Sequence, residues 1–277
     1  MEGGMKRHWM RKWALLAAAV TVVGCQNVQT TGSGAVGVSR GQAMMVSAAE
    51  VEQASAKQYS QVLLDARNKG VLNTDARLVS RVRGIAGRLI PQTGAFRADA
   101  PGWDWEVNVI TSDELNAWCM AGGKIAFYTG LITRLRLSDD EIAAVMGHEI
   151  AHALREHARE RVSQAMMTNL GVSVISAALG TGQAGADLMG TVAKVSFQLP
   201  NSRLHETEAD SMGVELAARA GYDPRAAVGL WQKMAAQSKG APPEWLSTHP
   251  SHTTRQQDLA RDAARVMPIY QANRRRR

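Results

Sequence analysis

The sequence predicts an α+β fold that is mainly helical, with a small β-sheet beside a helix that carries two histidines four residues apart. Apolar residues recur at helical spacing in several stretches, most clearly in 74–89 and 141–160. The stretch Trp103–Thr111 instead alternates apolar and polar residues, as a half-buried strand does. Because 45% of the 277 residues are hydrophobic, one sizeable core is expected, and we predict a single domain over residues 46–268.

The N-terminus has the pattern of a bacterial export signal. Basic residues in Lys6–Lys12 precede the apolar run Ala14–Val23, which is too short to span a bilayer comfortably. The run ends before Cys25 in a sequence that resembles a lipobox. We therefore expect 1–24 to be a lipoprotein signal peptide, Cys25 to be lipidated, and 25–45 to be a flexible tether, rich in Gly, Ser and Thr. The alternative is an ordinary secretory signal with an incidental cysteine.

The net charge of +7 comes from the two ends of the chain. Residues 1–24 carry a net charge of +3, and Arg274–Arg277 carry +4, so the rest of the chain is neutral. A solvated basic tail over 269–277 is expected, with contact to an anionic membrane or to nucleic acid as the alternative. Nothing else in the sequence indicates nucleic-acid binding.

The candidate site begins with His148-Glu149-Ile150-Ala151-His152. On a helix, His148 and His152 share a face and can direct two imidazoles at one metal ion, while Glu149 lies one residue round the helix. A capping box formed by Ser138 and Glu141 favours a helix here. This is the H-E-x-x-H arrangement of zinc metallopeptidases, in which zinc lowers the pKa of its bound water to about 7 and the Glu is the general base. The alternative is a surface helix with two solvated histidines.

A third protein ligand must come from elsewhere, because a catalytic zinc takes three. No histidine follows at the spacing that would supply it from the same stretch, and His157, outside that spacing, is expected at the surface. The helix expected over 202–221 offers a better candidate. Glu206 and Asp210 share one of its faces and Glu208 points roughly opposite, so we assign Glu206 as the ligand and Asp210 as the carboxylate that orients a ligating histidine. An exposed acidic helix face is the alternative.

A glycine pair, Gly122-Gly123, precedes a predicted strand, Lys124–Tyr128. We predict that this strand forms the sheet edge to which an extended substrate adds, with Gly122, Gly123, Lys124 and Ile125 as substrate contacts. The alternative is an interior strand.

Two residues near the C-terminus complete the candidate site. His249, in a loop, and Arg255, on a helix, are each candidates to stabilise the oxyanion that forms when water attacks a peptide carbonyl.

These motifs occur in the order found in one family. The chain resembles the gluzincin metallopeptidases that include the type I CAAX prenyl protease, HtpX, the Oma protease and BepA, and it looks most like the LoiP-type outer-membrane lipoproteins. The matching segments lie within residues 45–266 and are 116–118, 122–125, 148–152, 206–210, 248–250 and Arg255. One departure is Ala121, where relatives usually have Pro.

The resemblance implies one zinc ion per chain on His148, His152 and Glu206, with Glu149 as base. It also implies that His249 lies near the metal, where it aids catalysis or caps the zinc at rest, and that Arg255 lies close by. The expected function is cleavage of misfolded or unassembled envelope proteins at the periplasmic face of the outer membrane, by a protein anchored through Cys25. The alternatives are a chaperone-like binding module with a capped, silent zinc site and a zinc hydrolase of another class. The oligomeric state is not indicated.

Overall fold

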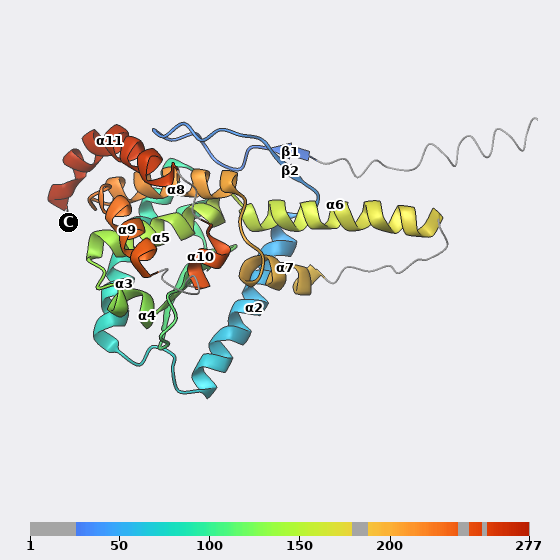
Figure 1. Cartoon of the computed structure of the whole chain (residues 1–277), viewed down its shortest axis with the longest axis horizontal. Coiled ribbons are helices and arrows are strands. Elements are labelled where there is room, and N and C mark those ends of the chain that lie inside the picture. The colour runs from blue at the N-terminus through green and yellow to red at the C-terminus, as the bar shows by residue number, and fades with distance from the viewer. Residues whose placement is uncertain (1–25, 179–187, 238–243, 251–253, 277) are drawn as a thin grey trace, which may run out of the picture.

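The computed structural model describes residues 26–178, 188–237, 244–250 and 254–276 (Figure 1). The predicted signal peptide and Cys25 lie outside these ranges, so lipidation of Cys25 remains a prediction. The helices are α2 (Ala48–Asn68), α3 (Ala76–Leu89), α4 (Thr129–Arg134), α5 (Asp139–Leu154), α6 (His157–Ala178), α7 (Leu188–Phe197), α8 (Arg203–Arg219), α9 (Ala226–Gln237), α10 (Glu244–Thr248) and α11 (Arg255–Asn273). The strands are β1 (Gln26–Val28), β2 (Gln42–Met44), β3 (Glu106–Ile110), β4 (Ala117–Met120) and β5 (Lys124–Tyr128). Among the described helices, none combines the length and the apolar character needed to cross a bilayer.

The three-stranded sheet has the order β3-β5-β4, so β5 is its central strand. Strand β3 runs parallel to β5, with Val109 opposite Phe127, and β4 runs antiparallel to it, with Trp118 opposite Ala126. The prediction that Lys124–Tyr128 forms the sheet edge is therefore wrong. The edge strands are β3 and β4, because the chain turns at the glycines after β4 and inserts β5 between its two partners.

The two faces of the sheet belong to different layers of the fold. Ile125 and Phe127 point into the main core, which α3, α5 and α8 share, and both are fully buried. Ala126 points to the opposite face, where it packs against Tyr59 of α2. The Tyr59 hydroxyl also donates a hydrogen bond of 2.9 Å to the backbone oxygen of Ile125. The predicted α+β fold is confirmed, with helices covering both faces of a small sheet.

Helices α5 and α8 cross in direct backbone contact, and this crossing positions the candidate site. At the crossing, each helix has a glycine. A Cβ atom on Gly147 would lie 2.7 Å from the carbonyl oxygen of Gly213, and one on Gly213 would lie 2.6 Å from the backbone nitrogen of His148. Each helix begins where the sequence predicts. Ser138 forms the capping box with Glu141 of α5, and Ser202 caps α8.

The N-terminal segment, residues 26–46, packs against the protein and does not form the expected tether. Strands β1 and β2 pair antiparallel. The fully buried Gln42 donates hydrogen bonds of 2.7 Å to the Arg155 backbone oxygen and to Glu160. The backbone N–H of Val36 donates to Glu215 of α8 at 2.9 Å. Because these partners lie more than 100 residues away along the chain, no local pattern indicates them.

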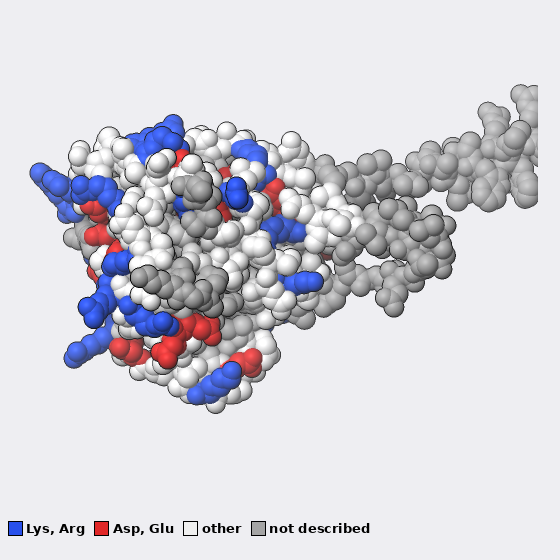
Figure 2. All heavy atoms as spheres, in the orientation of Figure 1, with Lys and Arg blue, Asp and Glu red and all other residues white. Residues whose placement is uncertain are grey.

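The C-terminal helix continues further than predicted. Helix α11 extends through Asn273, so the predicted basic tail, 269–277, is helical over its first half. On the face shown in Figure 2, basic side chains gather at the end of the molecule that carries α11, while acidic and basic side chains are interspersed over the remainder.

Candidate metal centre

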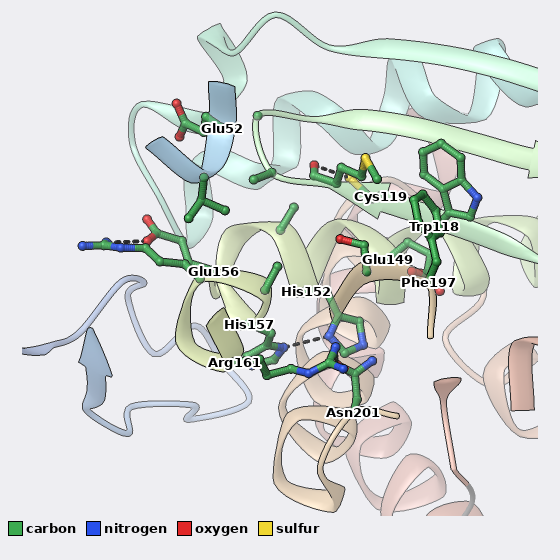
Figure 3. A pocket seen from close by; sticks show the side chains of 18 of the residues that line it. Glu52, Trp118, Cys119, Glu149, His152, Glu156, His157, Arg161, Phe197 and Asn201 are labelled. Carbon is green, nitrogen blue, oxygen red and sulfur yellow. Dashed lines mark hydrogen bonds and ion pairs between the residues drawn. The ribbon is translucent and has the colours of Figure 1, made fainter. Parts of the chain in front are cut away.

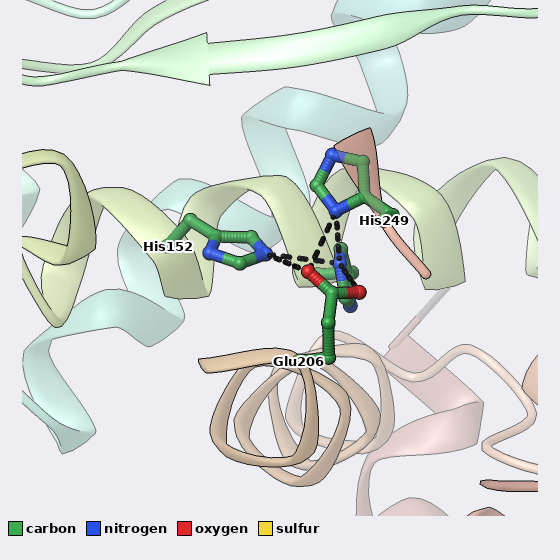
Figure 4. A group of neighbouring side chains, drawn as sticks. His152, Glu206 and His249 are labelled. Carbon is green, nitrogen blue, oxygen red and sulfur yellow. Dashed lines mark hydrogen bonds and ion pairs between the residues drawn. The ribbon is translucent and has the colours of Figure 1, made fainter. Parts of the chain in front are cut away.

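Four buried side chains from three parts of the chain converge beside the α5–α8 crossing (Figure 4). His148 and His152 come from α5, Glu206 comes from α8, and His249 follows α10. Their ligand atoms all lie within 4.8 Å of one another. The Nε2 atoms of His148 and His152 are 3.1 Å apart, and Glu206 Oε1 lies 3.3 Å from His152 Nε2. The structure thus brings together the three predicted ligands and the histidine that the resemblance placed nearby.

The geometry of these donors fits a small divalent metal ion. Imidazole nitrogens and one carboxylate are a typical zinc donor set, and tetrahedral ligands with bonds of about 2.0 Å lie about 3.3 Å from one another. Oε2 of Glu206 is buried and makes no hydrogen bond of normal geometry, although Nη1 of Arg255 lies 2.9 Å from it. The same oxygen lies 3.5 Å from Nε2 of His148, which is a separation that two ligands of one metal ion can have.

The electrostatics of the cluster favour the protonation states that bind metal. Burial alone would raise the pKa of Glu206, but the nearby charges of His249 and His148 hold it well below its usual range. Burial lowers the pKa of His152 well below its ordinary value. An ionised carboxylate and a neutral imidazole are the forms that coordinate a metal. In contrast, the charges of Glu206 and Glu149 raise the pKa of His249 despite its burial, which favours an ion pair between His249 and Glu206.

Asp210 and Arg255 lie behind the cluster and contact two of the predicted ligands. Oδ1 of Asp210 is 2.9 Å from Nδ1 of His148, so the carboxylate can accept a hydrogen bond from the imidazole. Arg255 donates to the same Oδ1 at 2.8 Å. Its guanidinium also lies over the ring of Trp231, with Cζ 3.4 Å from the centroid. Asp210 therefore has the position that was predicted for it, next to the outer nitrogen of a ligand.

His157 is buried against the cluster, and the prediction that it lies at the surface is wrong. Its Nδ1 lies 2.8 Å from Nδ1 of His152, and its Nε2 lies 2.9 Å from Glu208. Burial lowers the pKa of His157 to about 3. The surface prediction extended α5 beyond its end. The chain instead leaves the helix after Leu154 and turns at Glu156, which has φ of +53°, so that α6 begins by returning His157 to the site.

Glu149 is held by a tryptophan, Trp245, that belongs to none of the sequence motifs. Nε1 of the buried Trp245 donates a hydrogen bond of 2.8 Å to Oε1 of Glu149. The same indole stacks on His249 at a centroid distance of 4.9 Å. Trp245 and His249 are four residues apart, and the His249 N–H donates to the Trp245 carbonyl. That helical spacing is the one signal in the sequence that could have indicated Trp245.

A cleft opens over this cluster, between α6, α7 and the edge strand β4 (Figure 3). Glu149, His152 and His249 line it, together with Trp118 of β4 and Phe197 of α7. Arg255 does not line it, so of the two candidates for oxyanion stabilisation only His249 faces the cleft.

The predicted substrate contacts divide at the glycine turn. Gly122 lines the cleft, whereas Gly123, Lys124 and Ile125 do not. Nζ of Lys124 is 2.8 Å from carboxylate oxygens of both Asp104 and Glu106, and Ile125 is fully buried. The prediction that β5 contacts substrate is therefore not supported by this geometry, because β4 rather than β5 borders the cleft.

The fold and this site define a class of metalloenzyme in which one helix supplies H-E-x-x-H and a second helix supplies a carboxylate. The family described as Peptidase family M48 matches residues 79–263 of the chain. The chain belongs to this family, as the sequence motifs predicted.

Known proteins with related sequences carry names of the same kind. Mitochondrial metalloendopeptidase OMA1 of Arabidopsis thaliana is 38% identical over 159 residues, which cover 57% of this chain and 32% of the relative. Metalloendopeptidase OMA1, mitochondrial, of Bos taurus is 32% identical over 226 residues, which cover 76% and 42%. The Beta-barrel assembly-enhancing protease of Escherichia coli is 31% identical over 218 residues, which cover 73% and 42%. The matched regions thus span less than half the length of each of these relatives.

Proposed function

We propose that this protein is a zinc endopeptidase whose metal ligands are His148, His152 and Glu206. The observation that carries the proposal is the convergence of these three buried groups beside a cleft whose wall includes His152 and Glu149. Bound zinc would supply a Lewis acid, which lowers the pKa of water and polarises a peptide carbonyl.

The residues of the chain divide the remaining work. Glu149 accepts the proton of the attacking water and passes it to the leaving amine, and the hydrogen bond from Trp245 fixes its carboxylate for this transfer. Asp210 fixes the orientation of His148 through Nδ1. His249 lines the cleft and donates to the developing oxyanion.

The proposed substrates are unfolded or misassembled envelope proteins, and the proposed location is the periplasmic face of the outer membrane, with the chain anchored through lipidated Cys25. Three features support this proposal. The free edge of β4 borders the cleft and offers main-chain pairing to an extended peptide of any sequence. One relative is named for β-barrel assembly. The sequence before Cys25 resembles a lipobox.

The experiment is casein cleavage by the purified protein, with and without a chelator, for wild type and for Glu149→Gln. We expect cleavage to fall by at least about 100-fold in the variant because the proton acceptor is lost, while zinc content stays at one ion per chain. Glu52→Gln is the matched control, since Glu52 also lines the cleft but lies on α2. Cleavage by Glu149→Gln at the wild-type rate would contradict the proposed role.

The position of His249 favours a second candidate, a binding module in which this residue caps the zinc. Nδ1 of His249 lies 3.0 Å from Glu206 and 3.2 Å from His148, within the cluster itself. A capped resting protease would gain activity on His249→Ala. A binding module would retain unfolded clients but would not cleave them in either form.

A further inference from the structure

Behind the metal centre, a buried carboxylate collects three partners from distant parts of the chain. Glu208 of α8 is 5% exposed and lies 2.9 Å from Nε2 of His157. Nη2 of the fully buried Arg155 lies 3.1 Å from it. Arg40 of the N-terminal segment donates to both of its oxygens, at 3.0 and 3.1 Å. The proposed metal function does not use any of these groups directly.

The carboxylate of Glu208, at the end of this network, determines the direction of its hydrogen bonds. An ionised carboxylate can only accept, so Nε2–H of His157 donates to Glu208. A neutral imidazole has one donor and one acceptor, so Nδ1 of His157 accepts from Nδ1–H of His152. This leaves the lone pair of His152 on Nε2, the atom that lies 3.1 Å from Nε2 of His148 in the metal cluster.

The two histidines of α5 therefore have different supports. His148 donates its outer N–H directly to a carboxylate, Asp210. His152 is linked to its carboxylate, Glu208, through His157, which lies between them. A histidine relay of this kind functions only if its terminal carboxylate is held in place, and Arg155 and Arg40 do so from two directions.

Arg40 links the N-terminal segment to this relay. Besides Glu208, its guanidinium binds Glu160 of α6 at 2.7 and 2.9 Å, and Gln42 of the same segment binds Glu160 at 2.7 Å. The segment precedes the region that matches the peptidase family, residues 79–263. It nevertheless supplies one of the two cations that fix the carboxylate.

We propose that Glu208, held by Arg40 of the N-terminal segment, is a positioning residue that sets the tautomer and orientation of His152 through His157. This inference rests on the proposed function, because it treats His152 as a metal ligand. It makes the N-terminal segment a part of the metal site's support.

The test measures zinc affinity in the full chain, by competition with a chromophoric chelator. We expect Glu208→Gln to lower zinc affinity by about 10- to 100-fold, as loss of an outer partner typically does. Glu215→Gln is the matched control, because Glu215 is also a buried carboxylate of α8 that accepts from an arginine and from the N-terminal segment, but it does not contact the histidines. The control should lose less than about threefold. Equal losses in the two variants would overturn the inference.

A double-mutant cycle tests whether the effect travels through His157. In a His157→Phe background, Glu208→Gln should cause no further loss of zinc affinity, because the relay is already broken. His157→Gln, which keeps one acceptor and one donor, should recover part of the affinity. Additive losses in the double variant would overturn the proposed route.

A spectroscopic measurement separates positioning from general destabilisation. With cobalt in place of zinc, Glu208→Gln and Arg40→Ala should shift the visible absorption bands, and Glu215→Gln should not. Unshifted bands in both test variants would overturn the inference. Wild-type protein that binds zinc but cleaves nothing would refute the proposed function and leave this inference standing, whereas wild-type protein that binds no zinc would refute both.

Discussion

The contact between Gly147 and Gly213 offers a quantitative test of how the fold places the metal ligands. A methyl group added by Gly147→Ala would lie 2.7 Å from the Gly213 oxygen and 3.2 Å from its Cα. To reach ordinary contact, α5 and α8 must separate by about 0.7 Å, because the two backbones cannot yield otherwise. Because His148 belongs to α5 and Glu206 to α8, this separation would move the two ligands apart. Metal sites tolerate a change of only about 0.2 Å in ligand distance. We therefore expect zinc affinity to fall by about tenfold or more.

The stability cost can be isolated with a second glycine. Gly84 lies within α3, and an added Cβ there meets no atom within 4 Å. Gly→Ala in a helix contributes about 1 kcal/mol of favourable propensity at either position. The difference between Gly147→Ala and Gly84→Ala in the free energy of unfolding therefore reports the overpacking alone, which we expect to be about 1–3 kcal/mol.

Urea denaturation of the metal-free variants and chelator competition for zinc measure the two effects separately. If Gly147→Ala is stabilised as much as Gly84→Ala and binds zinc like the wild type, the helices are not in the contact described, and the reasoning fails.

Three further changes test other parts of the site. Asp210→Asn should lower zinc affinity by about 10- to 100-fold, because His148 loses a charged partner; a chelator titration with unchanged affinity would contradict this. Trp245→Phe removes one hydrogen bond to Glu149, which is worth about 1 kcal/mol, and keeps the stacked ring. We therefore expect steady-state peptide kinetics to show kcat reduced by about 5- to 10-fold with little change in KM. A change mainly in KM would contradict this, because it would mean that the ring contacts substrate. Although burial alone would raise the pKa of Glu160, hydrogen bonds from Arg40, His205 and Gln42 hold it well below its ordinary value. As the pH falls below about 5, Glu160 becomes protonated in the unfolded chain before it does so in the folded protein, so the free energy of unfolding should decrease. Urea titrations between pH 6 and 3 should show a weaker pH dependence of this free energy in Glu160→Gln.

The parts of the site that the sequence predicted are those that depend on local helical geometry. The capping box of Ser138 and Glu141 marked the start of α5, and the phase of α8 distinguished Glu206 from Glu208. Both arguments use residues within one or two helical turns. A period of 3.6 residues is enough to place such side chains relative to one another, whatever the tertiary structure.

The parts that the sequence did not predict depend on contacts between distant segments. Arg40 meets its carboxylates on α6 and α8 across 120 and 168 residues. His157 is near its partner in sequence, but the turn at Glu156 decides its direction. The central position of β5 follows from how the three strands pair. The apolar pattern of a strand does not show whether that strand lies in the middle of a sheet or at its edge.

If the proposed function is correct, the edge position of β4 has a consequence for which polypeptides the cleft can accept. The strand has four residues, and its outer edge borders the cleft that holds Glu149. A chain docked there must present several consecutive residues in extended form with their amide groups unpaired. Regular helices and interior strands of folded proteins already use those groups. Conformational state, more than side-chain identity, would then determine which chains are cut.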